Sequence, residues 1–168
     1  MAKNKSKIIL LDNMVLVSLF ENLYSVNKIH FDKIINNLIL EFTRVWIPQT
    51  VKKEFIDNIH IKEKKKREKR FKRIQSQFPQ IVICPIKVSN KEMEVLVASK
   101  TDNLGEADAI LQIQKAKNNL TQDFYTFSDI VFLTSDKAAI RLANNLGIIT
   151  RNFNEFKKQQ REIGISIP

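Results

Sequence analysis

The fold is decided by the stretch IILLD at residues 8–12, in which four aliphatic residues stop at the carboxylate of Asp12. Four aliphatic residues in succession predict a strand that is buried on both faces, as in a parallel sheet. The apolar residues that follow, from Val15 to Phe20, have helical spacing, so Asp12 lies between a strand and a helix. In open α/β sheets, functional side chains gather at the carboxyl ends of the strands. Other carboxylates that reach this edge would form a site with Asp12.

The rest of the chain alternates between short apolar runs and helical patterns. Further runs predict strands at 45–47, 81–86, 130–133 and 148–150. Helical patterns occupy residues 31–39, 49–77, 89–99, 106–118 and 153–161, and a loop is expected at 121–128. This order predicts a three-layer α/β/α sandwich with a central, mostly parallel sheet. A length of 168 residues fits a single domain over 1–168.

The chain is strongly basic, with 28 Lys and Arg against 18 Asp and Glu and a formal charge of +10. Residues 62–73 hold nine of these cations and predict a long, solvated helix that continues the helix begun at residue 49. A polyanion, above all nucleic acid, is the expected partner. The candidate nucleic-acid-binding residues are Lys64, Lys65, Lys66, Arg67, Lys69, Arg70, Lys72 and Arg73. A solvated face or a contact between copies in a homo-oligomer is the alternative, and Phe71 is expected to pack on a neighbouring helix.

The number of cysteines and the hydropathy of the chain indicate the compartment in which we expect the protein. The single cysteine, Cys84, excludes an internal disulfide framework, fits a reducing cytoplasm, and is expected in the core. No run of about 18 apolar residues is present, so we expect a cytoplasmic protein without a membrane partner.

Four carboxylates stand at expected strand ends and helix starts. Asp12 and Asp136 each follow a buried strand, and Glu54 and Glu106 lie near the starts of helices. If they converge, their mutual repulsion raises their pKa values. A hard cation, Mg²⁺ or Mn²⁺, relieves that repulsion and keeps waters that can attack a phosphodiester. A basic surface with an acidic pocket therefore predicts a metal-dependent nuclease.

Each carboxylate also has a simpler interpretation. Asp12 and Asp136 could be helix N-caps. Glu106 could be favoured by the helix dipole, and Glu54 could be an ordinary exposed residue. Because Glu106 projects on the apolar side of its helix, we expect it to face inward and Asp108 to face solvent.

Four motifs, in order, resemble the PIN-domain family over nearly the whole chain. The strand and aspartate at 8–16 resemble the opening of the family, and the segment 45–54 resembles its "v-x-i-P … V-x-x-E" motif. Residues 105–110, GEADAI, resemble its "GEA-x-AI" helix start. Residues 133–148, from LTSDKAA to LGI, resemble the strand and helix that follow its fourth acid.

This resemblance implies a Mg²⁺- or Mn²⁺-dependent endoribonuclease, acting on RNA rather than DNA. It implies four metal-binding catalytic acids, namely Asp12, Glu54, Glu106 and Asp136. The accessory candidates are Asn13, Asp108, Thr134 and Ser135. Ribonuclease toxins of the family pair with an antitoxin, so a toxin–antitoxin role with a protein partner is one expectation.

One position departs from the family pattern. Two residues after the first aspartate the family usually has a small polar residue, whereas this chain has Met14, preceded by Asn13. The alternative function is therefore a catalytically silent PIN-like module that binds nucleic acid or protein, for example in a defence system. A phosphatase of the haloacid dehalogenase-like type is disfavoured because its second aspartate would have to occupy the position of Met14.

Overall fold

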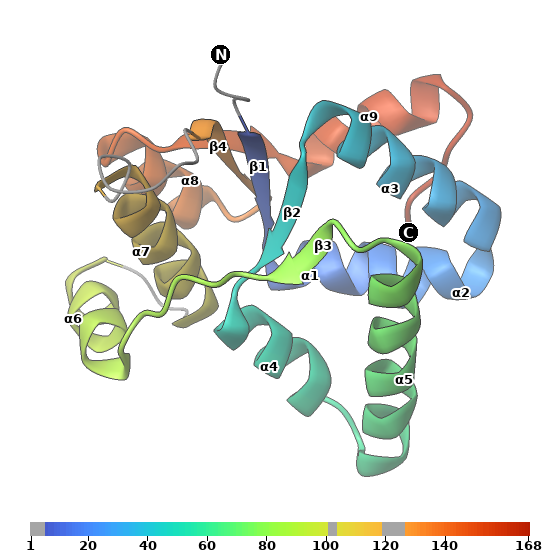
Figure 1. The fold of residues 1–168 in the computed structure, drawn as a ribbon, viewed down its shortest axis with the longest axis horizontal. Helices are drawn as coiled ribbons and strands as arrows, with labels where there is room; N and C mark the ends of the chain where they lie inside the picture. Colours follow the sequence, from blue (N-terminus) through green and yellow to red (C-terminus); the bar gives the residue numbers. More distant parts are fainter. Residues whose placement is uncertain (1–5, 101–103, 119–126) are drawn as a thin grey trace.

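The computed structural model describes residues 6–100, 104–118 and 127–168. Its centre is a five-stranded sheet in the order β3-β2-β1-β4-β5, and each of the pairings is parallel (Figure 1). The strands are β1 (Ser6–Leu11), β2 (Arg44–Ile47), β3 (Ile81–Ile83), β4 (Phe127–Thr134) and β5 (Ile149–Asn152). Helices cover both faces, so the predicted α/β/α sandwich is confirmed.

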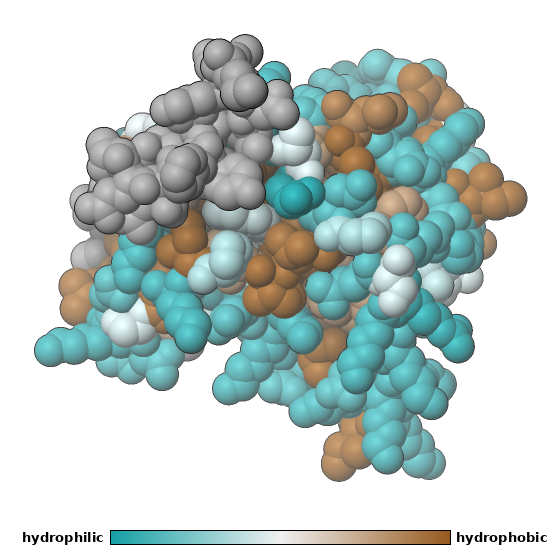
Figure 2. Space-filling model, viewed as in Figure 1, coloured by the Kyte–Doolittle hydropathy of each residue, from teal (hydrophilic) through white to brown (hydrophobic). Residues whose placement is uncertain are grey.

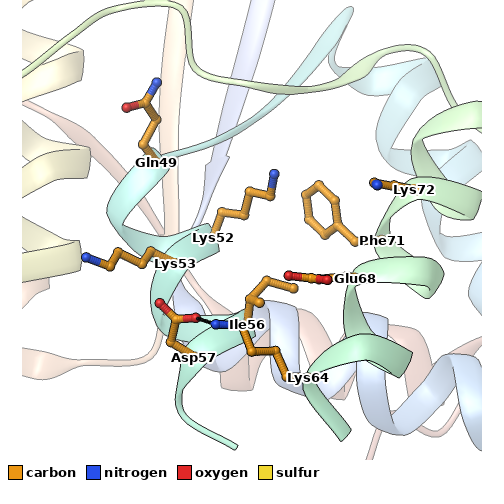
Figure 3. Close-up of a pocket in the computed structure, with 9 residues that line it drawn as sticks. All are labelled: Gln49, Lys52, Lys53, Ile56, Asp57, Lys64, Glu68, Phe71 and Lys72. Carbon is orange, nitrogen blue, oxygen red and sulfur yellow. Dashed lines mark hydrogen bonds and ion pairs between the residues drawn. The ribbon is translucent and has the colours of Figure 1, made fainter. Parts of the chain in front are cut away.

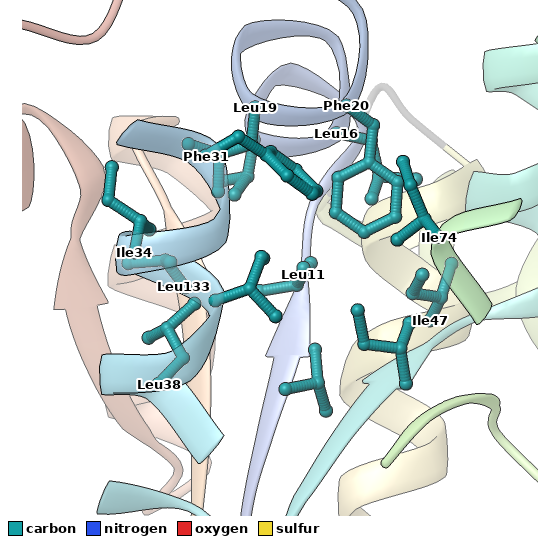
Figure 4. Close-up of a cluster of buried hydrophobic side chains, with 14 of the residues drawn as sticks. Leu11, Leu16, Leu19, Phe20, Phe31, Ile34, Leu38, Ile47, Ile74 and Leu133 are labelled. Carbon is teal, nitrogen blue, oxygen red and sulfur yellow. The ribbon is translucent and has the colours of Figure 1, made fainter. Parts of the chain in front are cut away.

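Strand β1 lies in the middle of the sheet and is buried on both sides, as the sequence predicts. Ile9 and Leu11 face one core, whereas Ile8 and Leu10 face the other. Figure 4 shows Leu11 within the larger of these clusters. Because β1 pairs with β4 in register, the two strands end side by side, and Asp12 and Asp136 both follow at the carboxyl edge.

The helices divide between the two faces of the sheet. They are α1 (Asn13–Leu16), the π-helical η1 (Val17–Leu23), α2 (Tyr24–Val26), α3 (Lys28–Glu41), α4 (Gln49–Asp57), α5 (Ile61–Gln77), α6 (Asn90–Lys100), α7 (Leu104–Asn118), α8 (Lys137–Asn145) and α9 (Phe153–Glu162). Phe31 of α3, Phe71 of α5 and Phe153 of α9 pack in one core, whereas Ile110 of α7 and Leu142 of α8 pack in the other. None of the helices in the described ranges is both long and apolar enough to cross a membrane.

Two sequence predictions about the elements are wrong. The helix expected over 49–77 is two helices, α4 and α5, separated at residues 58–60. The break lets Phe55 and Phe71 enter the same core from two directions. The third strand ends at Ile83 rather than Ile86, and Pro85, which lacks a backbone N–H, follows it.

The loop expected at 121–128 is only partly testable. Residues 119–126 lie outside the described residues. Residues 127 and 128 belong to β4, so the strand starts earlier than the apolar run alone predicts.

Candidate active site

Asp12 follows β1 and caps helix α1. Its Oδ1 accepts a hydrogen bond from the backbone N–H of Asn13 at 2.6 Å, and its Oδ2 accepts one from Thr134 Oγ1 at 2.8 Å. The residue is only 4% exposed. Burial raises the pKa of Asp12, the two hydrogen bonds oppose this, and the charge of Asp136 adds to it.

Asp136 occupies the corresponding position after β4. Its Oδ1 accepts hydrogen bonds from the backbone N–H groups of Ala138 and Ala139 at 2.7 and 2.9 Å, so it caps α8. Thr134 Oγ1 also accepts a hydrogen bond from the Asp136 N–H at 3.1 Å. Thr134 therefore links the two aspartates. Both aspartates are helix caps, and capping does not remove either of them from the site.

Glu106 reaches the same edge from the first turn of α7, where it is buried. Burial and the nearby charges of Asp136 and Asp12, with a side-chain hydrogen bond to Asp136 and the charge of Glu54, raise its pKa to about 8. The inward direction predicted for Glu106 is confirmed.

Glu54 approaches from α4 and is half-buried. Burial, followed by the charge of Asp12, raises the pKa of Glu54, and a hydrogen bond from the Gly105 backbone opposes the shift. A Cβ atom at position 105 would lie 3.0 Å from Glu54 Oε2. The glycine therefore lets the start of α7 come close to this carboxylate.

We call Asp12, Glu54, Glu106 and Asp136 the acidic edge. The four side chains come from separate segments, and the pKa shifts of three of them are coupled by charge to other members. Across the residues the structure describes, no Lys or Arg forms an ion pair with any of the four. The cluster is thus a concentration of like charge without a cationic partner in that part of the chain.

Asp108 does not face solvent, and that prediction is wrong. It is 3% exposed, and its Oδ2 accepts a hydrogen bond from the Thr50 N–H at 3.0 Å while its Oδ1 accepts one from Gln112 Nε2 at 3.0 Å. Helix α7 packs on α4 and α6 as well as on the sheet, so the side opposite Glu106 is also buried. Asp108 therefore satisfies the N-terminus of α4, and its charge also helps to raise the pKa of Glu54, after burial and the charge of Asp12. Burial raises the pKa of Asp108, and its bonds to Thr50 oppose the shift.

The remaining accessory candidates surround the departure at Met14. Met14 is 57% exposed, and Ser135 Oγ lies 3.6 Å from its sulfur. Asn13, next to Asp12 in the chain, has a buried Oδ1 for which the described residues provide no hydrogen-bond partner. A flexible thioether therefore lies beside Ser135, next to the acidic edge.

The basic residues of α5 do not form one surface. Arg67, 9% exposed, and Arg70 both pair with Glu21, at 3.0 and 2.8 Å. Lys64 pairs with Asp57, and Lys66 pairs with Glu63 at 2.8 Å. The exposed cations of α5 with no such pair among the described residues are Lys62, Lys65, Lys69, Lys72 and Arg73. Phe71 packs in the core, as expected.

Sequence reasoning missed two lysines of α4. Lys52 and Lys53 line a cavity of about 410 Å³ between α4 and α5, together with Lys64 and Lys72 of α5. In Figure 3 Lys52 points towards α5, whereas Lys53 points away from it. We call this cavity the lysine cleft. The pair stands next to Glu54 in the sequence, but only the packing of α5 beside α4 makes a cleft from it. Figure 2 shows that hydrophilic residues dominate the surface over these helices.

The carboxylates of the acidic edge do not surround one common point as the ligands of a bound metal ion would. Within the described ranges, no three His, Cys, Asp or Glu side chains are arranged to hold a metal ion.

No protein-family model matches the chain, and no curated protein matches it significantly in sequence. The functional argument therefore depends on the residues and their geometry.

Proposed function

We propose that this protein is a PIN-like, divalent-metal-dependent endoribonuclease whose catalytic acids are Asp12, Glu54, Glu106 and Asp136. The observation that carries the proposal is the convergence of these four carboxyl groups at the carboxyl edge of a parallel sheet. If Asp12 and Asp136 served only as helix caps, the fold would have no need to bring Glu54 of α4 and Glu106 of α7 close to them. Burial, together with the charges of Asp136 and Asp12, raises the pKa of Glu106 to about 8, and strongly shifted pKa values are typical of functional sites.

The donor set fits Mg²⁺ or Mn²⁺. All four side chains offer carboxylate oxygens, which hard divalent cations prefer. The hydrogen bond between Glu106 and Asp136 brings these side chains within contact distance. Burial is the largest cause of the raised pKa of Glu106, and a cation would relieve the repulsion by Asp136 and Asp12 that adds to it. When bound, the cation would supply an activated water for attack on a phosphodiester.

The chain itself orients the acids. Thr134 donates to Asp12 and accepts from the Asp136 N–H, so it fixes the spacing of the two strand ends. The N–H groups at the start of α8 hold Asp136 Oδ1. Each Asp12 oxygen accepts one protein hydrogen bond and keeps a further lone pair for a ligand.

The lysine cleft is the proposed path for the RNA backbone. It lies along α4, the helix that carries Glu54, and four lysines line it against two acids, Asp57 and Glu68. Positive charge beside the acidic edge attracts the phosphates that the acids alone would repel. Exposed cations on α5, such as Lys69, extend this field. RNA rather than DNA, a toxin role and an antitoxin partner are proposed from the family resemblance alone.

A second function is favoured by one observation, the exposed Met14 at the site. A PIN-like module without catalysis would keep the fold and the basic cleft and bind nucleic acid or a protein partner. The two functions differ in the affinity of the acidic edge for a divalent cation.

Calorimetric titration with Mn²⁺ separates the two functions. The wild-type chain is compared with the double variant Asp12→Asn, Asp136→Asn. The matched control is Asp32→Asn, Asp129→Asn, which changes the same charge away from the edge. We expect binding to wild type and control and none to the edge variant. Absence of Mn²⁺ binding to wild type, with and without RNA, would reject the nuclease and favour the binding module.

A further inference from the structure

A second basic cavity lies on the side of α5 that faces α2. Its volume is about 260 Å³, and the described residues that line it are Tyr24, Lys66, Lys69, Arg70 and Arg73. We call it the Tyr24 pocket. The lysine cleft faces α4 and is lined by other residues of α5. Figure 1 shows α5 between α4 and α2, so the two cavities border different sides of one helix.

The Tyr24 pocket is the more positively charged of the two cavities. Each described residue that lines it is Lys or Arg, apart from Tyr24. In the lysine cleft, by contrast, four lysines are accompanied by Asp57 and Glu68. The Tyr24 pocket thus has an equal number of cations around a smaller volume, and an anion bound there would relieve their mutual repulsion.

Arg70 is held in place at the wall of this pocket. Its Nη1 lies 2.8 Å from Glu21 Oε2, and its guanidinium lies over the ring of Tyr24, 5.6 Å from the centroid. The Tyr24 ring in turn packs edge-to-face on the buried ring of Phe31. The Arg70 side chain still exposes 21% of its surface, so an anion in the pocket can reach its other N–H groups. Because the side chain is already ordered, such an anion would bind at a small cost in entropy.

Glu21 offsets only part of the positive charge beside the pocket. The oxygen that contacts Arg70 also lies 3.0 Å from Arg67 Nε. One carboxylate therefore serves two guanidinium groups, and a net positive charge remains.

The other cations of the pocket are accessible. Lys69 and Arg73 are exposed, and neither forms an ion pair within the part of the chain that the structure describes. Lys66 pairs with Glu63 at 2.8 Å, but both side chains are exposed, and ion pairs in water are weak. These three side chains can turn towards an anion that Arg70 holds.

We propose that the Tyr24 pocket binds a backbone phosphate of the RNA, at a point that lies outside the lysine cleft. This inference rests on the proposed ribonuclease function and adds to it a second RNA contact, on the other side of α5. Arginine suits a phosphate because its planar guanidinium can donate two parallel hydrogen bonds. A phosphodiester backbone carries a charge at every nucleotide, so an RNA that crosses α5 can place phosphates in both cavities.

Fluorescence anisotropy with a labelled RNA tests the proposal. The measurement uses the Asp12→Asn protein, which prevents cleavage while binding is recorded. The pocket variant adds Lys69→Ala and Arg73→Ala, which remove two exposed cations and leave the anchored Arg70 in place. The matched control adds Lys33→Ala and Lys158→Ala, which remove the same charge from α3 and α9.

We expect the pocket variant to bind RNA a few-fold more weakly than the control. The slope of log affinity against log salt should fall by about 1.4, or about 0.7 for each lost phosphate contact. Adding Lys52→Ala and Lys72→Ala of the lysine cleft should multiply the losses, because the two cavities are separate. An equal loss in the control would overturn the proposal, as would a combined variant that binds no more weakly than the cleft variant alone.

Competition experiments separate RNA from other anions. A mononucleotide that displaces RNA from the pocket as well as RNA itself does, at equal phosphate concentration, would assign the pocket to a free nucleotide. A pocket variant that loses affinity for polyglutamate and keeps its affinity for RNA would assign it to an acidic protein. Either result overturns the proposal.

A spectroscopic readout covers the case in which the pocket variant does not fold. The Nε–H resonance of Arg70 is followed in the Asp12→Asn protein during titration with RNA. A shift that persists after Lys52→Ala and Lys72→Ala supports the proposal, and no shift at saturation overturns it. A wild-type chain that neither cleaves nor binds RNA fails the proposed function itself, whereas RNA cleavage with equal binding by pocket variant and control fails this inference alone.

Discussion

Charged side chains are concentrated at the acidic edge and on helix α5, and the fold arranges these two groups in opposite ways. The acids come from four separate segments and approach one another, and no Lys or Arg among the described residues forms an ion pair with them. The cations of α5 are consecutive in the sequence but point in different directions, and Arg67 and Arg70 are held by Glu21. Acids that are far apart in the sequence thus come together, whereas cations that are adjacent in the sequence are spread over different sides of one helix.

This difference shows that charge density along a chain is a poor measure of charge available to a partner. A helix distributes consecutive side chains around its axis, so neighbours in sequence face the core, the solvent and other helices. Arg67 lies over the ring of Phe55 at 4.6 Å and serves the packing of α5. The four lysines that share one cavity come from two helices, Lys52 and Lys53 from α4 and Lys64 and Lys72 from α5.

The largest effect is expected at the acidic edge. Asp12→Asn should lower metal-dependent RNA cleavage at least a hundredfold, a range known for loss of a key charged group in an active site. The folded state should persist, because Asn also caps helices. Cleavage is measured with saturating Mn²⁺, and circular dichroism monitors folding. Wild-type rates in the variant would remove Asp12 from the catalytic set.

A buried member of the basic run should affect stability rather than binding. Arg67→Met should lower the free energy of unfolding by about 2 kcal/mol, because the variant loses charged hydrogen bonds in a mostly buried position. Lys65→Met, on the exposed side, should change it by less than about 0.5 kcal/mol. Urea denaturation of both variants provides the measurement. Equal changes would mean that α5 is a uniform solvated helix.

The acidic edge should also make stability depend on pH. The folded protein keeps a proton on Glu106 up to about pH 8, whereas the ordinary pKa of this group is 4.5. Between these values the folded state binds more protons than the unfolded chain, so stability falls as pH rises. Denaturation midpoints of the metal-free protein should decrease across this window. Glu106→Gln should flatten the decrease and exposed Glu155→Gln should not; equal slopes would contradict the coupling.

The smallest effect is expected from the lysine cleft. Replacing Lys52 and Lys72 by Ala should weaken RNA binding a few-fold, and the slope of log affinity against log salt should fall by about 1.4, or about 0.7 for each single-strand phosphate contact. The control replaces Lys33 and Lys158, which are exposed elsewhere. Fluorescence anisotropy at several salt concentrations measures the slope. The same loss in the control would mean that only net charge matters.

The sequence predicts the parts of this protein that local pattern controls. Doubly buried strands require unbroken aliphatic runs, so residues 8–11 and 130–133 mark the centre of a parallel sheet. Because parallel strands share a carboxyl edge, Asp12 and Asp136 are expected together. The helical spacing of Glu106 with its apolar neighbours gives its inward direction. These inferences need only the periods of a strand and a helix.

Only the tertiary structure decided the features that depend on a second element. Asp108 is buried because α4 offers it an N–H group, and a helical pattern considers one buried face and cannot find a partner 58 residues away. Arg67 donates a hydrogen bond to Glu21, 46 residues earlier in the chain, and this contact keeps its side chain away from the surface. The break between α4 and α5 and the two cavities that flank α5 arise from packing. Alternation along the chain determined the sheet and where its acids lie, whereas contacts between distant segments determined which polar groups are satisfied and which remain available to a ligand.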